Sequence, residues 1–276
     1  MTQIELGVGT VEYRDTGGTG PVIVLLHGLL MDASLWDSVI PEISPHFRVI
    51  APTLPFGAHR IAVRADADLS LPGTAATVRE LLDRLDLRDV TLVGNDTGGA
   101  VAQLAAADPR VGRLVLVSCE AFDNLPPGLT GRTIAALGRL PAGLFRAFMQ
   151  QMRLKPARRL PIAFGRLTRR GDRATRAWMA PILTQKAIAR DSVRVLRAVF
   201  ADRTILMRAA EDLRGFDRPA LVVWAKHDRV MPPEHGRRLA ELLPQGRLVE
   251  IEDTDTLIPL DQPGRLAEAL RGFQSP

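Results

Sequence analysis

The sequence is poor in the residues and runs that define several classes of protein. One cysteine, Cys119, and one tyrosine occur among its 276 residues, so a disulfide framework is excluded. No run approaches the roughly 20 apolar residues that a membrane-spanning helix needs. The amino terminus lacks the basic start and apolar core of a secretory signal. Together these absences predict a cytoplasmic protein without a membrane span.

Metal and nucleic-acid sites are not indicated either. The five histidines show no spacing typical of metal ligands, and we expect neither a metal nor an organic cofactor. The few aromatic residues do not interleave with basic ones as they do in nucleic-acid-binding modules. We therefore do not expect a nucleic-acid partner.

The positive charge is concentrated in one part of the chain. The net charge is +5, but residues 132–176 contain twelve basic residues and a single acid, Asp172. Such a run is usually a solvated helical face. The alternative is an electrostatic field that steers an anionic substrate or a membrane surface toward the protein.

Unbroken apolar runs predict strands of a sheet that is covered on both faces. After an alternating hairpin at 4–14, such runs occupy 22–26, 47–51, 90–94, 114–117, 220–224 and 248–251. Helices are expected between them, at 75–85, 99–108, 233–243 and 263–273. This alternation predicts an α/β fold with a mostly parallel sheet of eight strands.

One region breaks the alternation. From about residue 120 to 218 no strand-like run occurs, and helical segments are separated by prolines. Apolar residues between Leu137 and Met152 are expected to contact the core or to roof a pocket. We predict a single domain, 1–276, with a core of residues 1–119 and 219–276 and an inserted helical cap at about 120–218.

The most specific motif is Gly-Asn-Asp-Thr-Gly at residues 94–98, which directly follows a buried strand and precedes a helix. Such a turn holds its central residue in a strained conformation, and glycines must flank it because the chain packs closely there. The Asp96 side chain is thereby expected to stand above the sheet at a helix N-terminus. The simpler interpretation is that Asp96 only caps the helix.

With this motif the chain resembles the α/β-hydrolase family over nearly its whole length. The His-Gly-Leu segment at 27–29 resembles the family's oxyanion loop, which implies an oxyanion hole formed by the N–H groups of Leu29 and Thr97 and a structural role for His27. With an aspartate at the centre of this turn, the nucleophile elbow of the family, the chain resembles the branch that contains haloalkane dehalogenases and epoxide hydrolases. In that branch the carboxylate attacks an electrophilic carbon, and a histidine then activates water to hydrolyse the covalent ester.

Two acidic residues match positions of the family's catalytic acid, but no histidine stands at the position of its catalytic histidine. Asp228 follows the seventh strand, where most of the family keeps its catalytic acid, and Glu120 follows the sixth, where some dehalogenases keep theirs. Thr256 stands where the family has its histidine, and a threonine hydroxyl is no base near neutral pH. As substitutes we considered His227, beside Asp228, and two nearby carboxylates, Asp253 and Asp255.

Features of the individual activities are also missing. Thr97 and Leu29 stand at the positions where haloalkane dehalogenases have halide-binding side chains. Epoxide hydrolases use two tyrosines of the cap, whereas the lone tyrosine of this chain, Tyr13, lies outside the expected cap. The leading hypothesis is a hydrolase of a small organic substrate with Asp96 as nucleophile or general base. A non-hydrolytic lyase or cyclase and an inactive ligand-binding protein are the alternatives.

Overall fold

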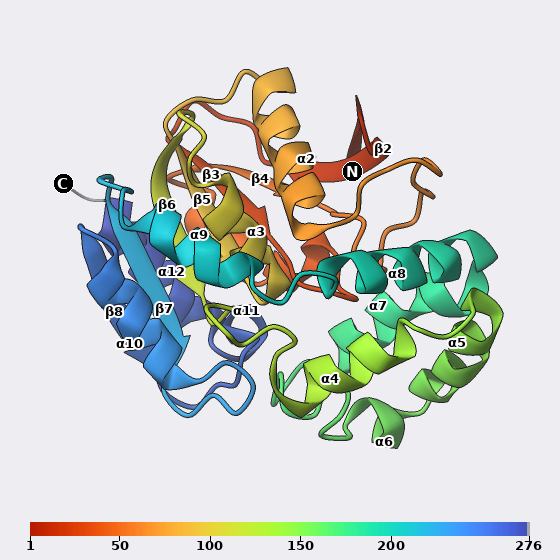
Figure 1. The fold of residues 1–276 in the computed structure, drawn as a ribbon. Coiled ribbons are helices and arrows are strands. Elements are labelled where there is room, and N and C mark those ends of the chain that lie inside the picture. The colour runs from red at the N-terminus through yellow and green to blue at the C-terminus, as the bar shows by residue number, and fades with distance from the viewer. Residues whose placement is uncertain (275–276) are drawn as a thin grey trace.

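In the computed structural model, which describes residues 1–274, eight strands form one sheet in the order β1-β2-β4-β3-β5-β6-β7-β8 (Figure 1). β1 and β2 form an antiparallel hairpin, β2 pairs antiparallel with β4, and β3 to β8 run parallel. The bounds are Thr2–Leu6, Gly9–Asp15, Val22–Leu26, Arg48–Pro52, Val90–Asn95, Val111–Val117, Ala220–Ala225 and Gly246–Ile251. The predicted α/β fold with a mostly parallel sheet of eight strands is confirmed. Of the predicted core, residues 275 and 276 lie outside the described residues.

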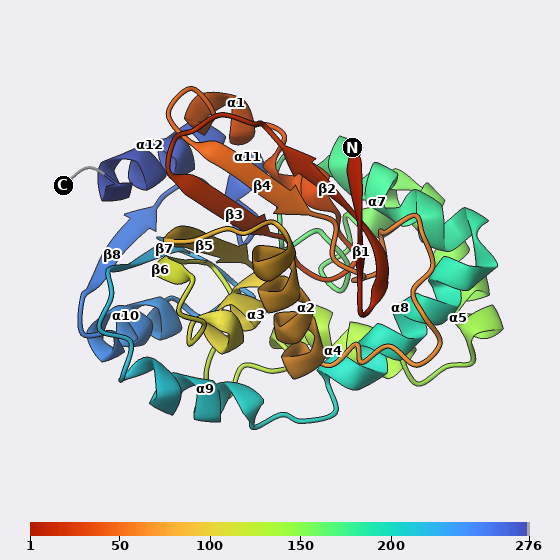
Figure 2. The same ribbon diagram turned by 90° about the horizontal axis from the view of Figure 1, so that it is seen from above.

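Helices cover both faces of the sheet, which explains the unbroken apolar strands. Every residue of β5 and β7 is buried. Figure 2 shows α1, α11 and α12 on one face and α2, α3, α9 and α10 on the other. Their bounds are Ile40–Ile43, Ile258–Asp261 and Pro263–Gln274 on the first face, and Leu71–Arg84, Thr97–Ala105, Ile205–Leu213 and Pro233–Leu242 on the second. A short 3-10 helix, η1 (Ala33–Trp36), follows β3.

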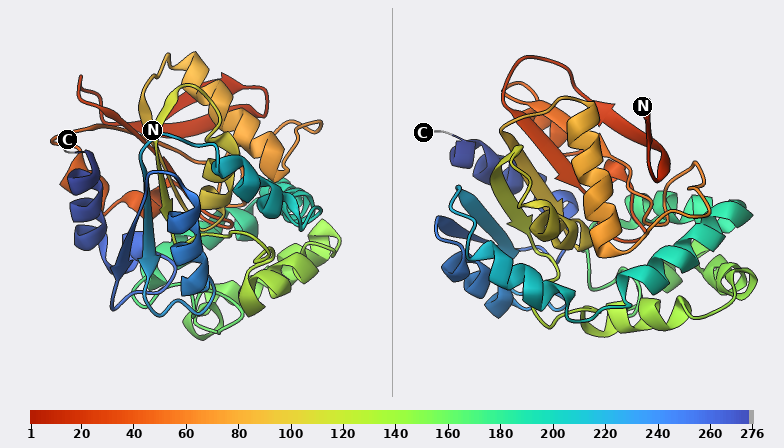
Figure 3. Two further views of the ribbon diagram at one scale, coloured as in Figure 1. Left: turned by 60° about the vertical axis from the view of Figure 1, so that its left-hand side comes forward. Right: turned by 45° about the horizontal axis from the view of Figure 1, so that its top comes forward.

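A helical insertion, defined here as α4 to α8 (residues 128–199), separates β6 from α9 and β7. It gathers on one side of the sheet (Figure 3). Its elements are α4 (Gly128–Leu137), α5 (Ala142–Met149), η2 (Gln150–Arg153), α6 (Lys155–Arg158), α7 (Asp172–Thr184) and α8 (Lys186–Val199). Pro141 caps α5, so the apolar stripe from Leu137 to Met152 is divided between helices.

The insertion is attached to loops of the core by buried polar contacts. The indole N–H of Trp178 in α7 donates to Ser34 Oγ at 2.8 Å. The carboxylate of Asp191 in α8 accepts from the backbone N–H of Val63 at 3.1 Å. Both of these side chains are fully buried, and the two bonds join the insertion to η1 and to the segment between β4 and α2. No helix of residues 1–274 is long and apolar enough to cross a membrane.

Candidate active site

The turn after β5 places Asp96 between strand and helix, as the motif predicts. Asp96 has φ 55° and ψ −137°, a conformation that is strained for a residue with a side chain. A Cβ on Gly94 would lie 2.3 Å from the carbonyl oxygen of Gly98, so a side chain at position 94 would collide with the first turn of α3. The local sequence thus allows the sharp turn that lifts Asp96 above the sheet.

The Asp96 carboxylate is held by the two backbone groups expected to form an oxyanion hole. Its Oδ1 accepts from the N–H of Thr97 at 2.8 Å and from the N–H of Leu29 at 3.3 Å. The loop can approach this closely because residue 28 is glycine, where a Cβ would lie 2.0 Å from Asp96 Oδ1. Oδ2 accepts no hydrogen bond from the described residues, so it is the oxygen that a ligand can reach.

A second carboxyl group, Glu120, is linked to Asp96 through one hydroxyl. The Thr97 Oγ1 atom lies 2.7 Å from Glu120 Oε1 and 3.2 Å from Asp96 Oδ1. One hydroxyl carries one proton and cannot donate to two carboxylates at once. A protonated Glu120 resolves this, because it donates to Thr97 and leaves the Thr97 proton for Asp96.

The surroundings of both carboxyl groups favour this assignment. Burial raises the pKa of Glu120 well above its usual value, and the negative charge of Asp96 raises it further. Burial also raises the pKa of Asp96, but the hydrogen bonds from Thr97 and Leu29 oppose that rise. Glu120 Oε2 is buried without a partner among the described residues. We therefore place the proton on Glu120 and the charge on Asp96.

Asp96, Thr97 and Glu120 line a cavity of about 100 Å³ between the sheet and the helical insertion. The rest of its wall is mostly apolar, with Phe145, Met149 and Phe164 from the insertion. Asp96 and Glu120 are the only ionisable side chains among the described residues that line it. Acid–base chemistry inside this cavity therefore depends on these two carboxyl groups.

Asp228, the other predicted acid, contacts the residue that stands in the histidine position. Its Oδ1 accepts from Thr256 Oγ1 and from the N–H groups of Val230 and Met231, each at 2.9 Å. Oδ2 is buried without a partner among the described residues, and burial raises the pKa of Asp228 to about 6. Asp228 and Thr256 are thus brought together, yet neither is among the residues that line the cavity with Asp96.

No histidine of the described chain lines the cavity. His27 is fully buried, with Nδ1 donating to the carbonyl of Gly28 at 2.9 Å and Nε2 accepting from the N–H of Leu54 at 2.8 Å. Burial lowers the pKa of His27 to about 4, which keeps the ring neutral and structural. His227 follows β7 and is exposed, whereas its neighbour Asp228 is buried.

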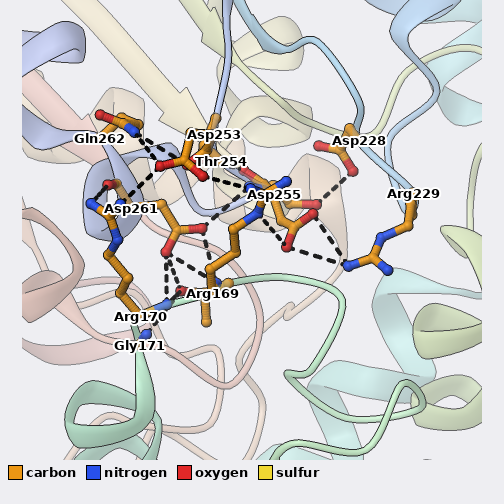
Figure 4. Close-up of polar contacts among 12 residues, drawn as sticks. Arg169, Arg170, Gly171, Asp228, Arg229, Asp253, Thr254, Asp255, Asp261 and Gln262 are labelled. Atoms are coloured by element: carbon orange, nitrogen blue, oxygen red, sulfur yellow. Dashed lines mark hydrogen bonds and ion pairs between the residues drawn. The ribbon is translucent and has the colours of Figure 1, made fainter.

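The carboxylates considered as substitute bases are engaged by arginines (Figure 4). Asp253 pairs with Arg169 at 2.7 Å and with Arg170 at 2.9 Å, and Asp255 lies 3.5 Å from both Arg169 and Arg229. At the end of α11, which follows this loop, the fully buried Asp261 accepts from the N–H groups of Arg169 and Arg170 at 3.0 Å. This loop binds the segment before α7 and supplies no base to the cavity.

Two functional contacts were not anticipated from the sequence. The first is the Thr97 hydroxyl, which links Asp96 to Glu120. The sequence shows a threonine directly after Asp96, and this is the only local feature that points to the link. Asp261 also accepts from Thr168 Oγ1 at 2.7 Å across 93 residues of sequence, and no local pattern marks that pairing.

Comparison with known proteins places the chain in one fold family. Residues 21–263 match the sequence profile described as alpha/beta hydrolase fold. An uncharacterised protein of Mycobacterium tuberculosis is 29% identical over 281 residues, which cover 93% of this chain and 76% of that protein. A pimeloyl-(acyl-carrier protein) methyl ester esterase of Aeromonas hydrophila is 28% identical over 264 residues, covering 93% of this chain and 96% of the esterase.

The fold is shared with solved structures as well. An ancestral haloalkane dehalogenase superposes with a TM-score of 0.77 at 22% identity, covering 99% of this chain and 98% of that one. At this identity the likeness concerns the fold. Hydrolases that act on different kinds of bond are therefore similar to this chain.

Proposed function

Because this chain belongs to the alpha/beta hydrolase fold family, we propose that it is a hydrolase that attacks a small apolar electrophile with the Asp96 carboxylate. The observation that carries the proposal is the state of the two oxyanion donors. The N–H groups of Leu29 and Thr97 both donate to Asp96 Oδ1, so they are not free to bind the carbonyl oxygen of a substrate. This arrangement favours displacement at a saturated carbon over direct attack on an ester carbonyl.

In the first step Asp96 Oδ2 forms a bond to the substrate carbon, and the leaving group departs with the electron pair of the broken bond. The product is an alkyl ester on Asp96. The apolar wall suits an uncharged substrate of a few heavy atoms, given the cavity of about 100 Å³. Where the leaving group is an alkoxide, the proton of Glu120 is available to neutralise it.

Hydrolysis of this ester needs a base, and Glu120 is the group we assign. Esterification removes the charge of Asp96, which is one cause of the raised pKa of Glu120. Glu120 gives up its proton, either to an alkoxide leaving group or to solvent when the leaving group departs as an anion, and then takes a proton from water as the water oxygen attacks Cγ of Asp96. The oxyanion formed at Oδ1 is stabilised by the N–H groups of Leu29 and Thr97. Its collapse breaks the ester bond, the alcohol leaves with the proton from Glu120, and the proton of the regenerated Asp96 carboxyl group returns to Glu120.

Intact-mass spectrometry against a panel of short alkyl halides and epoxides tests the nucleophile. Wild type quenched during turnover is expected to carry one alkyl group on Asp96 transiently, and Asp96→Asn none. Hydrolysis in heavy-oxygen water separates the two roles of Asp96. A nucleophile carries label into its own carboxylate, whereas a general base sends the label directly into the alcohol. The proposal is wrong if wild type and Asp96→Ala show the same absence of adduct and turnover.

A further inference from the structure

Large exposed apolar side chains are concentrated on the helical insertion. Eight such side chains occur in the described residues, and six of them lie between positions 129 and 162. We call these six the apolar face: Leu129 (49% exposed), Leu144 (60%), Phe148 (43%), Leu154 (64%), Leu160 (43%) and Ile162 (38%). They come from α4, α5 and the segment around α6, which lie together at the end of the molecule away from the carboxyl terminus (Figure 1). A concentration of exposed apolar side chains of this kind is typical of an interaction surface.

The apolar face surrounds the mouth of the cavity. Phe148, Leu160 and Ile162 are exposed and also line the cavity, so the cavity opens between them. Thr130 Oγ1 donates to the carbonyl of Pro161 at 3.0 Å, which holds the start of α4 against the same rim. Leu129 therefore lies beside this opening.

Cations without acidic partners accompany these side chains. Of the twelve basic residues at 132–176, only Arg158, Arg169 and Arg170 form ion pairs within the described part of the chain. Exposed Arg153 and Lys155 flank Leu154, the most exposed leucine of the face. The face thus combines protruding apolar side chains with an uncompensated positive charge, which are complementary to acyl chains and to lipid phosphates respectively.

We propose that the apolar face and its cations dock on an anionic lipid surface. The leucines and Phe148 insert at the boundary between headgroups and acyl chains, while Arg153 and Lys155 bind headgroup phosphates. The mouth of the cavity then faces the membrane. Docking does not depend on the chemistry of Asp96, so it can fail or hold separately from the proposed function.

Flotation of the full chain with phosphatidylcholine vesicles, with and without phosphatidylglycerol, tests the proposal. Wild type is expected to float with the anionic vesicles at low salt and to be released by high salt. Arg153→Gln with Lys155→Gln should weaken binding about fivefold for each cation. The matched control, Arg203→Gln with Arg247→Gln, removes the same charge from exposed residues outside the face and should change binding by less than about twofold.

A leucine variant separates a lipid surface from a simple polyanion site. Leu144 and Leu154 do not line the cavity, so Leu144→Ser with Leu154→Ser is expected to keep the fold and the cavity. It should bind the vesicles on the order of tenfold more weakly, and Met207→Ser, an exposed control outside the face, should not. The proposal is overturned if wild type does not bind anionic vesicles, if both charge variants weaken binding equally, or if the leucine variant binds as wild type does.

Discussion

Replacing Glu120 by glutamine is expected to separate formation of the Asp96 ester from its hydrolysis. Glutamine has the shape of a protonated glutamate, and its amide N–H donates to Thr97 Oγ1 over the 2.7 Å that Glu120 now spans. Thr97 therefore still donates to Asp96, and the nucleophile keeps its position. The glutamine cannot take a proton from water, so only the second step loses its base.

The size of the effect follows from what is removed. A positioned general base contributes about 10²- to 10⁴-fold to a rate, and the barrier to ester hydrolysis is expected to rise by about 3–5 kcal/mol. With an alkyl halide, whose leaving group needs no proton, formation of the ester should stay within about threefold of wild type, since the hydrogen-bonded chain from position 120 to Asp96 is preserved. The variant should thus accumulate the adduct that wild type turns over.

Rapid-quench mass spectrometry measures both steps on one sample. The adduct should appear at a similar rate in both proteins and persist only in Glu120→Gln. Glu241→Gln removes an exposed carboxylate on α10 and serves as the control, with no change expected in either step. If Glu120→Gln releases product as fast as wild type, or if both steps slow equally, Glu120 is not the base.

Three further substitutions test the surrounding structure. The pKa of Asp228 is about 6 in the folded protein and 3.8 in the unfolded chain, so wild type loses stability as the pH rises through this window. Asp228→Asn is therefore expected to stabilise the fold near pH 7.5 by up to about 3 kcal/mol, and the gain should vanish below pH 4. Urea unfolding across this pH range measures the difference. Unchanged stability at both pH values would contradict it. Gly28→Ala places a Cβ 2.0 Å from Asp96 Oδ1 and should slow adduct formation about 10²-fold in a protein with an unaltered circular dichroism spectrum. Asp261→Ala removes the acceptor of the Thr168 hydroxyl and of the N–H groups of residues 169 and 170 and should cost about 1–3 kcal/mol by calorimetry, whereas a loss under about 0.5 kcal/mol would refute its anchoring role.

The sequence predicted those parts of the site that depend on local spacing. Strand, glycine frame and helix around Asp96 follow one another within about ten residues, so their order alone indicated the turn. The family's order of elements placed Asp228 at the acid position and Thr256 at the histidine position, and in the structure the Thr256 hydroxyl donates to Asp228 at 2.9 Å.

Contacts between distant segments could not be predicted in this way. Thr97 and Glu120 meet because β5 and β6 are adjacent parallel strands, and the 2.7 Å between them depends on rotamers. Whether the N–H groups of Leu29 and Thr97 bind the Asp96 carboxylate also depends on the side-chain torsion angles of Asp96. The spacing of residues along the chain constrains neither this contact nor the distance between Thr97 and Glu120.

The anchoring by Asp261 has a consequence for how the substrate range can change. Asp261 receives hydrogen bonds from residues 168–170 and from the N–H of Asp255, so the segment that leads into α7 and the loop that holds Thr256 are bound to one buried carboxylate. These two segments are therefore held together, and separating them would leave the buried carboxylate without its donors. Selectivity is then exercised at the rim, where Phe148, Leu160 and Ile162 set the width of the entrance. Substitutions at these three positions would retune which molecules enter while the carboxyl pair beneath stays untouched.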